Sequence, residues 1–206
     1  MSLTDPYFAT STSTTGSSDA KPTGLCEEEH ILLHQVARKA VEQGLRQGGH
    51  LVVDTPYYPR PLREPGASFV TLKQHGELRG CIGSLEARRP LVEDVAYNAY
   101  AAAFADPRFP PLTEQDFSEV DIQLSVLSRA EPIQFDGEAD LLRQLRPGID
   151  GLILEDGRHR GTFLPAVWES LPQPAAFLQH LKMKAGLPAD YWSDTLKVSR
   201  YTTESF

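Results

Sequence analysis

Two pairs of strand-like runs, each joined by a short turn that contains glycine, constrain the fold of this sequence most. The turns contain Gly76 and Gly157, and glycine readily supplies the positive φ that tight hairpin turns need. We therefore predict two β-hairpins, and a hairpin joins antiparallel strands. The four runs comprise residues 67–73 and 77–82, followed by residues 152–155 and 162–164.

Single strands and helices separate these hairpins. Residues 120–126 alternate apolar and polar side chains, which is the pattern of a half-buried strand, and residues 196–201 are predicted as a last strand. Because helices and strands do not alternate in a strict βαβ order, we expect an α+β fold with a mostly antiparallel sheet and flanking helices. The predicted helices cover residues 27–48, the segment from Pro90 to Asp106, the region around Leu141 to Leu145, and residues 174–185.

Four prolines within residues 56–65 predict an extended surface loop, because proline fixes φ and removes a backbone donor. Tyr57 and Tyr58 lie in this loop. We expect them to pin the loop to the core, and the alternative is that they wall a pocket.

The N-terminal segment differs in composition from the rest of the chain. Residues 1–24 are rich in Ser, Thr, Gly and Asp, so they bury too little apolar surface to offset their conformational entropy. We predict that residues 1–24 form a disordered tail and that residues 25–206 form the folded α+β domain.

The charge and cysteine content narrow the class of protein. The formal net charge is −8, which argues against nonspecific binding to nucleic acid or to an anionic membrane. No apolar run approaches the ~20 residues of a membrane span, and no signal peptide is apparent. Cys26 and Cys81 are predicted to be free thiols in a reducing compartment, without the spacing of a metal site. We therefore expect a cytoplasmic protein.

The segment of residues 78–84 is the predicted functional site. Cys81 lies between Gly80 and Gly83, and Arg79 comes two residues before it. Glycines let another group approach the backbone closely. An arginine beside a thiol favours the reactive thiolate, so Arg79 is expected to lower the pKa of Cys81. The competing interpretation is that Cys81 is a small buried hydrophobe.

Several other residues extend this candidate site. Arg88 and Arg89 precede the helix that opens at Pro90 and could add positive potential near Cys81. His159 is the candidate base for Cys81 if the fold brings the two together. Arg108 is expected either to pair with a neighbouring aspartate or to face a ligand.

The motifs of this chain together resemble the signature of the AMMECR family, whose bacterial and archaeal members are called AmmeMemoRadiSam system protein A. The similarity covers roughly residue 25 to the C-terminus. It is carried by residues 69–72, 76–83 with the sequence Gly-Glu-Leu-Arg-Gly-Cys-Ile-Gly, 86–91, 102–104, 106–112, 125–128, 147–151, 161–165 and 184–188.

This resemblance implies an α+β fold with a larger and a smaller lobe. It also implies a setting, because relatives accompany a Memo-type protein and a radical S-adenosylmethionine enzyme. It supplies neither a reaction nor a cofactor. Some relatives carry a cysteine near position 182, where this chain has Lys182.

Three functions follow from these observations. In the first, the protein is a component of a modification pathway in which Cys81 is a nucleophile or carrier, Arg79 tunes it and His159 moves protons. In the second, it is a noncatalytic module in which Arg79, Arg88 and Arg108 bind an anionic small molecule or a partner protein. In the third, it is a scaffold without a pocket.

Overall fold

The computed structural model describes residues 23–206. These residues form two compact units, a larger one of Thr23–Leu127 with Glu204–Phe206 and a smaller one of Ser128–Thr203. The predicted tail, residues 1–24, lies outside the described residues except for Thr23 and Gly24. Among residues 23–206, none of the helices combines the length and the apolar character that crossing a membrane requires.

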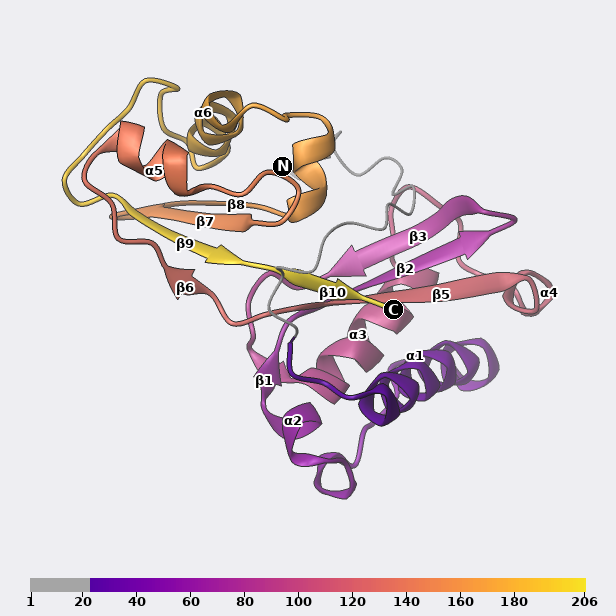
Figure 1. Cartoon of the computed structure of the whole chain (residues 1–206). Helices are drawn as coiled ribbons and strands as arrows, with labels where there is room; N and C mark the ends of the chain where they lie inside the picture. Colours follow the sequence, from indigo (N-terminus) through magenta and orange to yellow (C-terminus); the bar gives the residue numbers. More distant parts are fainter. Residues whose placement is uncertain (1–22) are drawn as a thin grey trace. The chain divides into compact units, whose positions relative to one another are not determined.

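The larger unit is built on a four-stranded sheet with the order β10-β5-β2-β3 and a two-stranded sheet of β1 and β4. Helices α1 and α3 pack against each other and cover one face of the four-stranded sheet (Figure 1). Its elements are α1 (Glu27–Gln47), η1 (Thr55–Tyr57), α2 (Arg60–Arg63), β1 (Pro65–Gly66), β2 (Ser68–Gln74), β3 (Glu77–Gly83), β4 (Arg89–Pro90), α3 (Leu91–Phe104), α4 (Glu114–Phe117), β5 (Val120–Leu127) and β10 (Thr203–Ser205).

The smaller unit has a second four-stranded sheet with the order β6-β9-β7-β8. Phe177 and Leu181 of α6 are fully buried in its core, where the Phe177 ring stacks on Trp168 at a centroid distance of 3.8 Å. Its elements are β6 (Glu131–Pro132), α5 (Glu138–Gln144), β7 (Gly151–Asp156), β8 (His159–Phe163), η2 (Pro165–Glu169), α6 (Pro174–Lys184) and β9 (Lys197–Tyr201).

The predicted α+β fold is confirmed. The strand pairs β1–β4, β2–β3, β2–β5, β6–β9, β7–β8 and β7–β9 are antiparallel. Both predicted hairpins form, as β2 with β3 and as β7 with β8. The apolar stripe of α1 is buried, because residues at helical spacing share one face that packs against α3.

The proline-rich segment differs from the prediction. It is not extended throughout, since it forms the short helices η1 and α2, each with a proline in its first two positions. Proline is tolerated there because that N–H has no intrahelical partner. Tyr58 packs against the core of the larger unit as expected, but Tyr57 is 85% exposed and pins nothing.

A buried carboxylate links the sheet of the larger unit to α3. Asp94, whose side chain is 1% exposed, accepts hydrogen bonds from the Ser68 N–H at 2.9 Å and the Ser68 hydroxyl at 2.8 Å. It also accepts from Ser84 Oγ at 2.8 Å and from Asn98 Nδ2 at 2.9 Å. Burial raises the pKa of Asp94, although these hydrogen bonds and Arg89 oppose that effect. We call these four residues the Asp94 network.

The Asp94 network is expected to be a main determinant of the stability of the larger unit. Asp94→Ala leaves several buried donors without an acceptor, and each such group costs about 1–3 kcal/mol. We expect the free energy of unfolding, measured by urea denaturation, to fall by about 3 kcal/mol. The control Glu42→Ala removes only a surface ion pair with Arg38 and should change stability by less than about 0.5 kcal/mol. Equal losses in the two variants would contradict this role.

Candidate functional site

The segment singled out in the sequence lies on β3, which is an edge strand because β2 is its partner in the sheet order. The register contains a β-bulge: Leu72 faces Gly80 and Lys73 faces Leu78, so Arg79 has no opposite residue. A bulge changes the direction of a side chain relative to plain alternation. Plain alternation would put Arg79 and Cys81 on one face of the strand, and the bulge breaks this alternation between them.

The two glycines of the segment accommodate neighbours inside the larger unit. A Cβ at Gly80 would lie 2.2 Å from the carbonyl oxygen of Ala102 in α3. A Cβ at Gly83 would lie 2.2 Å from the ring of Phe69. Both glycines thus permit a close approach, but the groups that approach them are protein atoms. A role for Gly80 and Gly83 in binding a ligand stays a prediction.

Cys81 has an environment that disfavours the thiolate. Its side chain is partly buried, and the Thr71 hydroxyl donates to Sγ at 3.3 Å. Burial raises the pKa of Cys81 and outweighs the lowering by the Thr71 hydrogen bond and by the positive charge of Arg108. The expectation that Arg79 lowers this pKa is therefore wrong, because the nearby cation is Arg108 and desolvation is the larger effect.

The backbone of Cys81 on the free edge of β3 is held by two side chains from the turn after α3. Asp106 accepts the Cys81 N–H at Oδ2 (2.9 Å), and Arg108 donates from Nη2 to the Cys81 carbonyl oxygen (3.2 Å). Arg108 also binds Asp106 through Nε to Oδ1 (3.0 Å) and Nη2 to Oδ2 (2.7 Å). We call Asp106 and Arg108 the edge clamp, because together they satisfy one donor and one acceptor of an otherwise open strand.

The charges of the edge clamp depend on each other. Burial acts to raise the pKa of Asp106, but hydrogen bonds from the Arg108 guanidinium and from the Cys81 and Arg108 N–H groups outweigh it, and the net pKa is lowered. Arg108 thus pairs with the neighbouring aspartate, one of the two alternatives raised by the sequence.

The other two predicted ligand-binding arginines also contact carboxylates. Arg88 pairs with Glu86 at 2.5 Å on the surface. Arg79 lies 3.7 Å from Asp116 and donates weakly to the Pro111 carbonyl oxygen at 3.4 Å. Its side chain is 12% exposed, and its Nη1 is buried without a hydrogen-bond partner in the described part of the chain. Ligand binding by these arginines stays a prediction.

His159 and Lys182 belong to the smaller unit. His159 Nδ1 lies 3.1 Å from the Ala185 carbonyl oxygen, and its role as a base for Cys81 stays a prediction. The Lys182 side chain is fully buried, and its Nζ binds Glu138 at 2.7 Å and lies 5.4 Å from the Trp192 ring centroid. The lysine at this position is therefore a packed and paired core residue.

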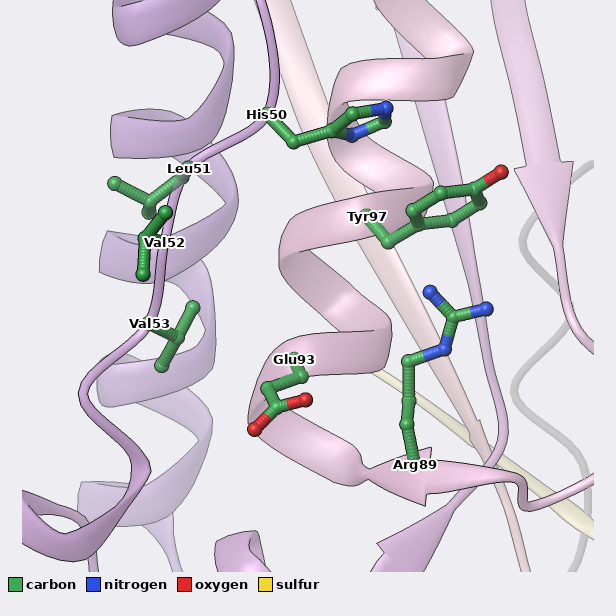
Figure 2. A pocket seen from close by; sticks show the side chains of 7 residues that line it. All are labelled: His50, Leu51, Val52, Val53, Arg89, Glu93 and Tyr97. Carbon is green, nitrogen blue, oxygen red and sulfur yellow. The ribbon is translucent and has the colours of Figure 1, made fainter.

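A pocket of about 290 Å³ lies elsewhere in the larger unit, between the segment of residues 50–53 and the start of α3 (Figure 2). Of the residues that line it, only Arg89 was predicted from the sequence, as a source of positive potential. The available sequence signal was the apolar run Leu51-Val52-Val53, which follows Gly48-Gly49-His50. The pocket is lined by His50, Arg89, Glu93, Tyr97 and the apolar residues 51–53.

An aromatic stack fixes the polar side of this pocket. Figure 2 shows Tyr97 between His50 and Arg89. The rings of His50 and Tyr97 are stacked at 4.8 Å with an interplanar angle of 3°, and Arg89 Cζ lies 4.2 Å from the Tyr97 centroid. Arg89 Nε is 3.5 Å from Asp94 Oδ1, so the guanidinium is held both by the ring and by the Asp94 network.

The edge clamp predicts a pH-dependent stability. A lowered folded pKa means that ionised Asp106 stabilises the fold above the ordinary carboxyl pKa, and this contribution is lost as the pH falls through the lowered value. Arg108→Ala should therefore reduce the free energy of unfolding by about 2 kcal/mol at pH 7 and by clearly less near pH 3. Urea denaturation at both pH values measures this difference.

Arg88→Ala is the matched control, because it removes a solvent-exposed pair and should cost less than about 0.5 kcal/mol at either pH. A loss in Arg108→Ala that is the same at both pH values would show that Arg108 acts through packing alone.

Comparison with known proteins agrees with this fold. The sequence model of the AMMECR1 family matches residues 34–206. A protein from Methanothermobacter thermautotrophicus is 37% identical over 188 residues, covering 88% of this chain and 95% of that protein. Protein MJ0810 from Methanocaldococcus jannaschii is 35% identical, with 87% and 90% covered. The crystal structure of PH0010 from Pyrococcus horikoshii is similar with a TM-score of 0.68 at 35% identity, covering 84% of this chain and 88% of that chain. This chain belongs to the AMMECR1 family.

Proposed function

We propose that this protein is a noncatalytic binding module in a modification pathway, working with a Memo-type protein and a radical S-adenosylmethionine enzyme. The pathway and its two partners are implied by the resemblance of the segment around Cys81 and the later motifs to the AMMECR family. The noncatalytic role is supported by the structure of that segment. The module operates in the cytoplasm, in keeping with two free cysteines.

The observation that carries the proposal is the set of contacts that Cys81 makes within the larger unit. A nucleophilic cysteine needs a lowered pKa and an adjacent base or cation that stabilises the thiolate. Burial instead raises the pKa of Cys81, and Thr71 donates its hydroxyl to the sulfur. The nearest cation, Arg108, is committed to Asp106 and to the Cys81 carbonyl oxygen. These contacts support a structural role for Cys81 at the sheet edge.

The position of the charged side chain that lines a pocket also agrees with a binding role. Arg79, Arg88 and Arg108 contact carboxylates or a backbone carbonyl, whereas Arg89 contacts Asp94 only through Nε and also lines a pocket. Ligand recognition by this unit is therefore assigned to the start of α3 and not to β3.

The rate of Cys81 alkylation tests the noncatalytic role. The protein is treated with iodoacetamide across pH 6–10, and labelling is followed by mass spectrometry, with exposed Cys26 as the internal reference. Because burial and a raised pKa both slow the reaction, Cys81 should react on the order of tenfold more slowly than Cys26 at pH 7.5. An apparent pKa of Cys81 well below the ~8.5 of a free thiol would overturn the proposal in favour of a catalytic cysteine.

The variant Cys81→Ser provides the second readout. It keeps a small polar side chain beside Thr71, so the protein should fold and retain its binding to a Memo-type partner in a pull-down with purified proteins. Loss of pathway function in a Cys81→Ser protein that still folds and binds would identify Cys81 as a reacting group.

A further inference from the structure

We propose that the pocket between residues 50–53 and the start of α3 binds a small zwitterion with an apolar body, of the amino-acid class. This inference rests on the proposed binding role and names its ligand, but it uses no residue of β3. The volume of about 290 Å³ is at the lower end for ligand pockets, which suits a molecule of this size.

Arg89 is prepared to receive the carboxylate. Its guanidinium lies over the Tyr97 ring, with Cζ 4.2 Å from the ring centroid, and its Nε is 3.5 Å from the buried Asp94. In the described chain its two terminal nitrogens have no hydrogen-bond acceptor. Because the arginine is already immobilised, little side-chain entropy is lost when a carboxylate binds both terminal nitrogens.

The aromatic stack explains why Arg89 stays in place. Tyr97 is held on its other face by His50, and His50 also contacts the Tyr100 ring at 4.1 Å. Tyr97 remains 41% exposed although it belongs to α3, so the stack forms an open wall of the pocket. Figure 2 shows that the stack lies across from the segment of residues 51–53.

Glu93 supplies the opposite charge. One of its carboxylate oxygens accepts from the Thr55 hydroxyl at 2.5 Å, which fixes the side chain. No cation of residues 23–206 pairs with Glu93, although it lines the same pocket as Arg89. A fixed carboxylate repels phosphates and other polyanions and attracts an ammonium group. The pair of opposite charges therefore favours a ligand that carries both.

The third feature is the apolar wall. Val52 is 89% exposed, and its neighbours Leu51 and Val53, which also line the pocket, are partly buried against the core of the larger unit. Apolar residues beside two fixed charges are typical of a site that binds the body of a ligand while polar groups orient it. An aliphatic amino acid matches all three features.

Binding is tested with L-leucine as the probe, by isothermal titration calorimetry and by ¹H–¹⁵N correlation spectra of the full chain. We expect a dissociation constant between about 10 μM and 1 mM, with shift changes at His50 and Tyr97. The analogues 4-methylpentanoate, which lacks the amine, and 3-methylbutylamine, which lacks the carboxylate, should each bind at least about tenfold more weakly. No shift change at 10 mM L-leucine, or equal binding of either analogue, overturns the proposal.

Two variants test whether Arg89 and Glu93 bind the two charged groups of the ligand. Arg89→Gln and Glu93→Gln should each weaken L-leucine binding at least about tenfold. Arg88→Gln, which changes the adjacent arginine outside the pocket, should leave it unchanged. If Arg89→Gln fails to fold because Tyr97 and Asp94 lose a partner, the partly exposed Glu93→Gln still decides the outcome. Wild-type affinity in Glu93→Gln overturns the zwitterion assignment.

The result of this binding experiment can be distinguished from the result of the alkylation experiment that tests the proposed function. If L-leucine does not bind and Cys81 is alkylated slowly, amino acids are excluded as the ligand class and the noncatalytic binding role is retained. Rapid alkylation of Cys81 at low pH overturns the binding role whatever the pocket binds, because Cys81 does not line this pocket.

Discussion

The buried carboxylate of Asp94 is the interaction on which the larger unit depends. A buried carboxylate is costly unless donors surround it, and here the donors come from Ser68 at the start of β2, Ser84 just after β3 and Asn98 on α3. Satisfying one group therefore fixes two strands against one helix. The same carboxylate faces Arg89, so the position of the pocket arginine follows from the packing of the sheet on α3.

The edge strand β3 shows that a segment with a distinctive sequence motif can have a structural role. Gly80 lets the strand approach the Ala102 carbonyl of α3, and the edge clamp of Asp106 and Arg108 satisfies the backbone of Cys81. An open edge with free donors and acceptors invites pairing with another chain. The clamp occupies such positions with charged side chains, and it places an arginine near the thiol without making the thiol acidic.

Membership in the AMMECR1 family identifies the fold of both units, while the proposed function separates two regions of the larger one. Residues of the segment around Cys81 form hydrogen bonds and packing contacts with other residues of the larger unit. The pocket of His50, Arg89, Glu93 and Tyr97 presents two opposite charges held in place, an arginine that contacts Asp94 only through Nε and a carboxylate fixed by Thr55. Because both side chains are already held in place, little side-chain entropy is lost when a ligand binds. This contrast is why binding is assigned to the start of α3.

The sequence by itself determined the elements of the fold. The hairpins, helices and antiparallel sheets follow from local sequence patterns. These patterns are the alternation of residues 120–126, the glycine turns, and the helical spacing of Leu33, Val36 and Ala40. Only the tertiary structure decided the site. The bulge at Arg79 depends on the register of the hairpin. The hydrogen bond from Arg108 to the Cys81 carbonyl oxygen and the stack of His50 on Tyr97 join residues distant in the sequence. Local periodicity carries no information on such contacts, because they depend on register, burial and the packing of α3 on the sheet.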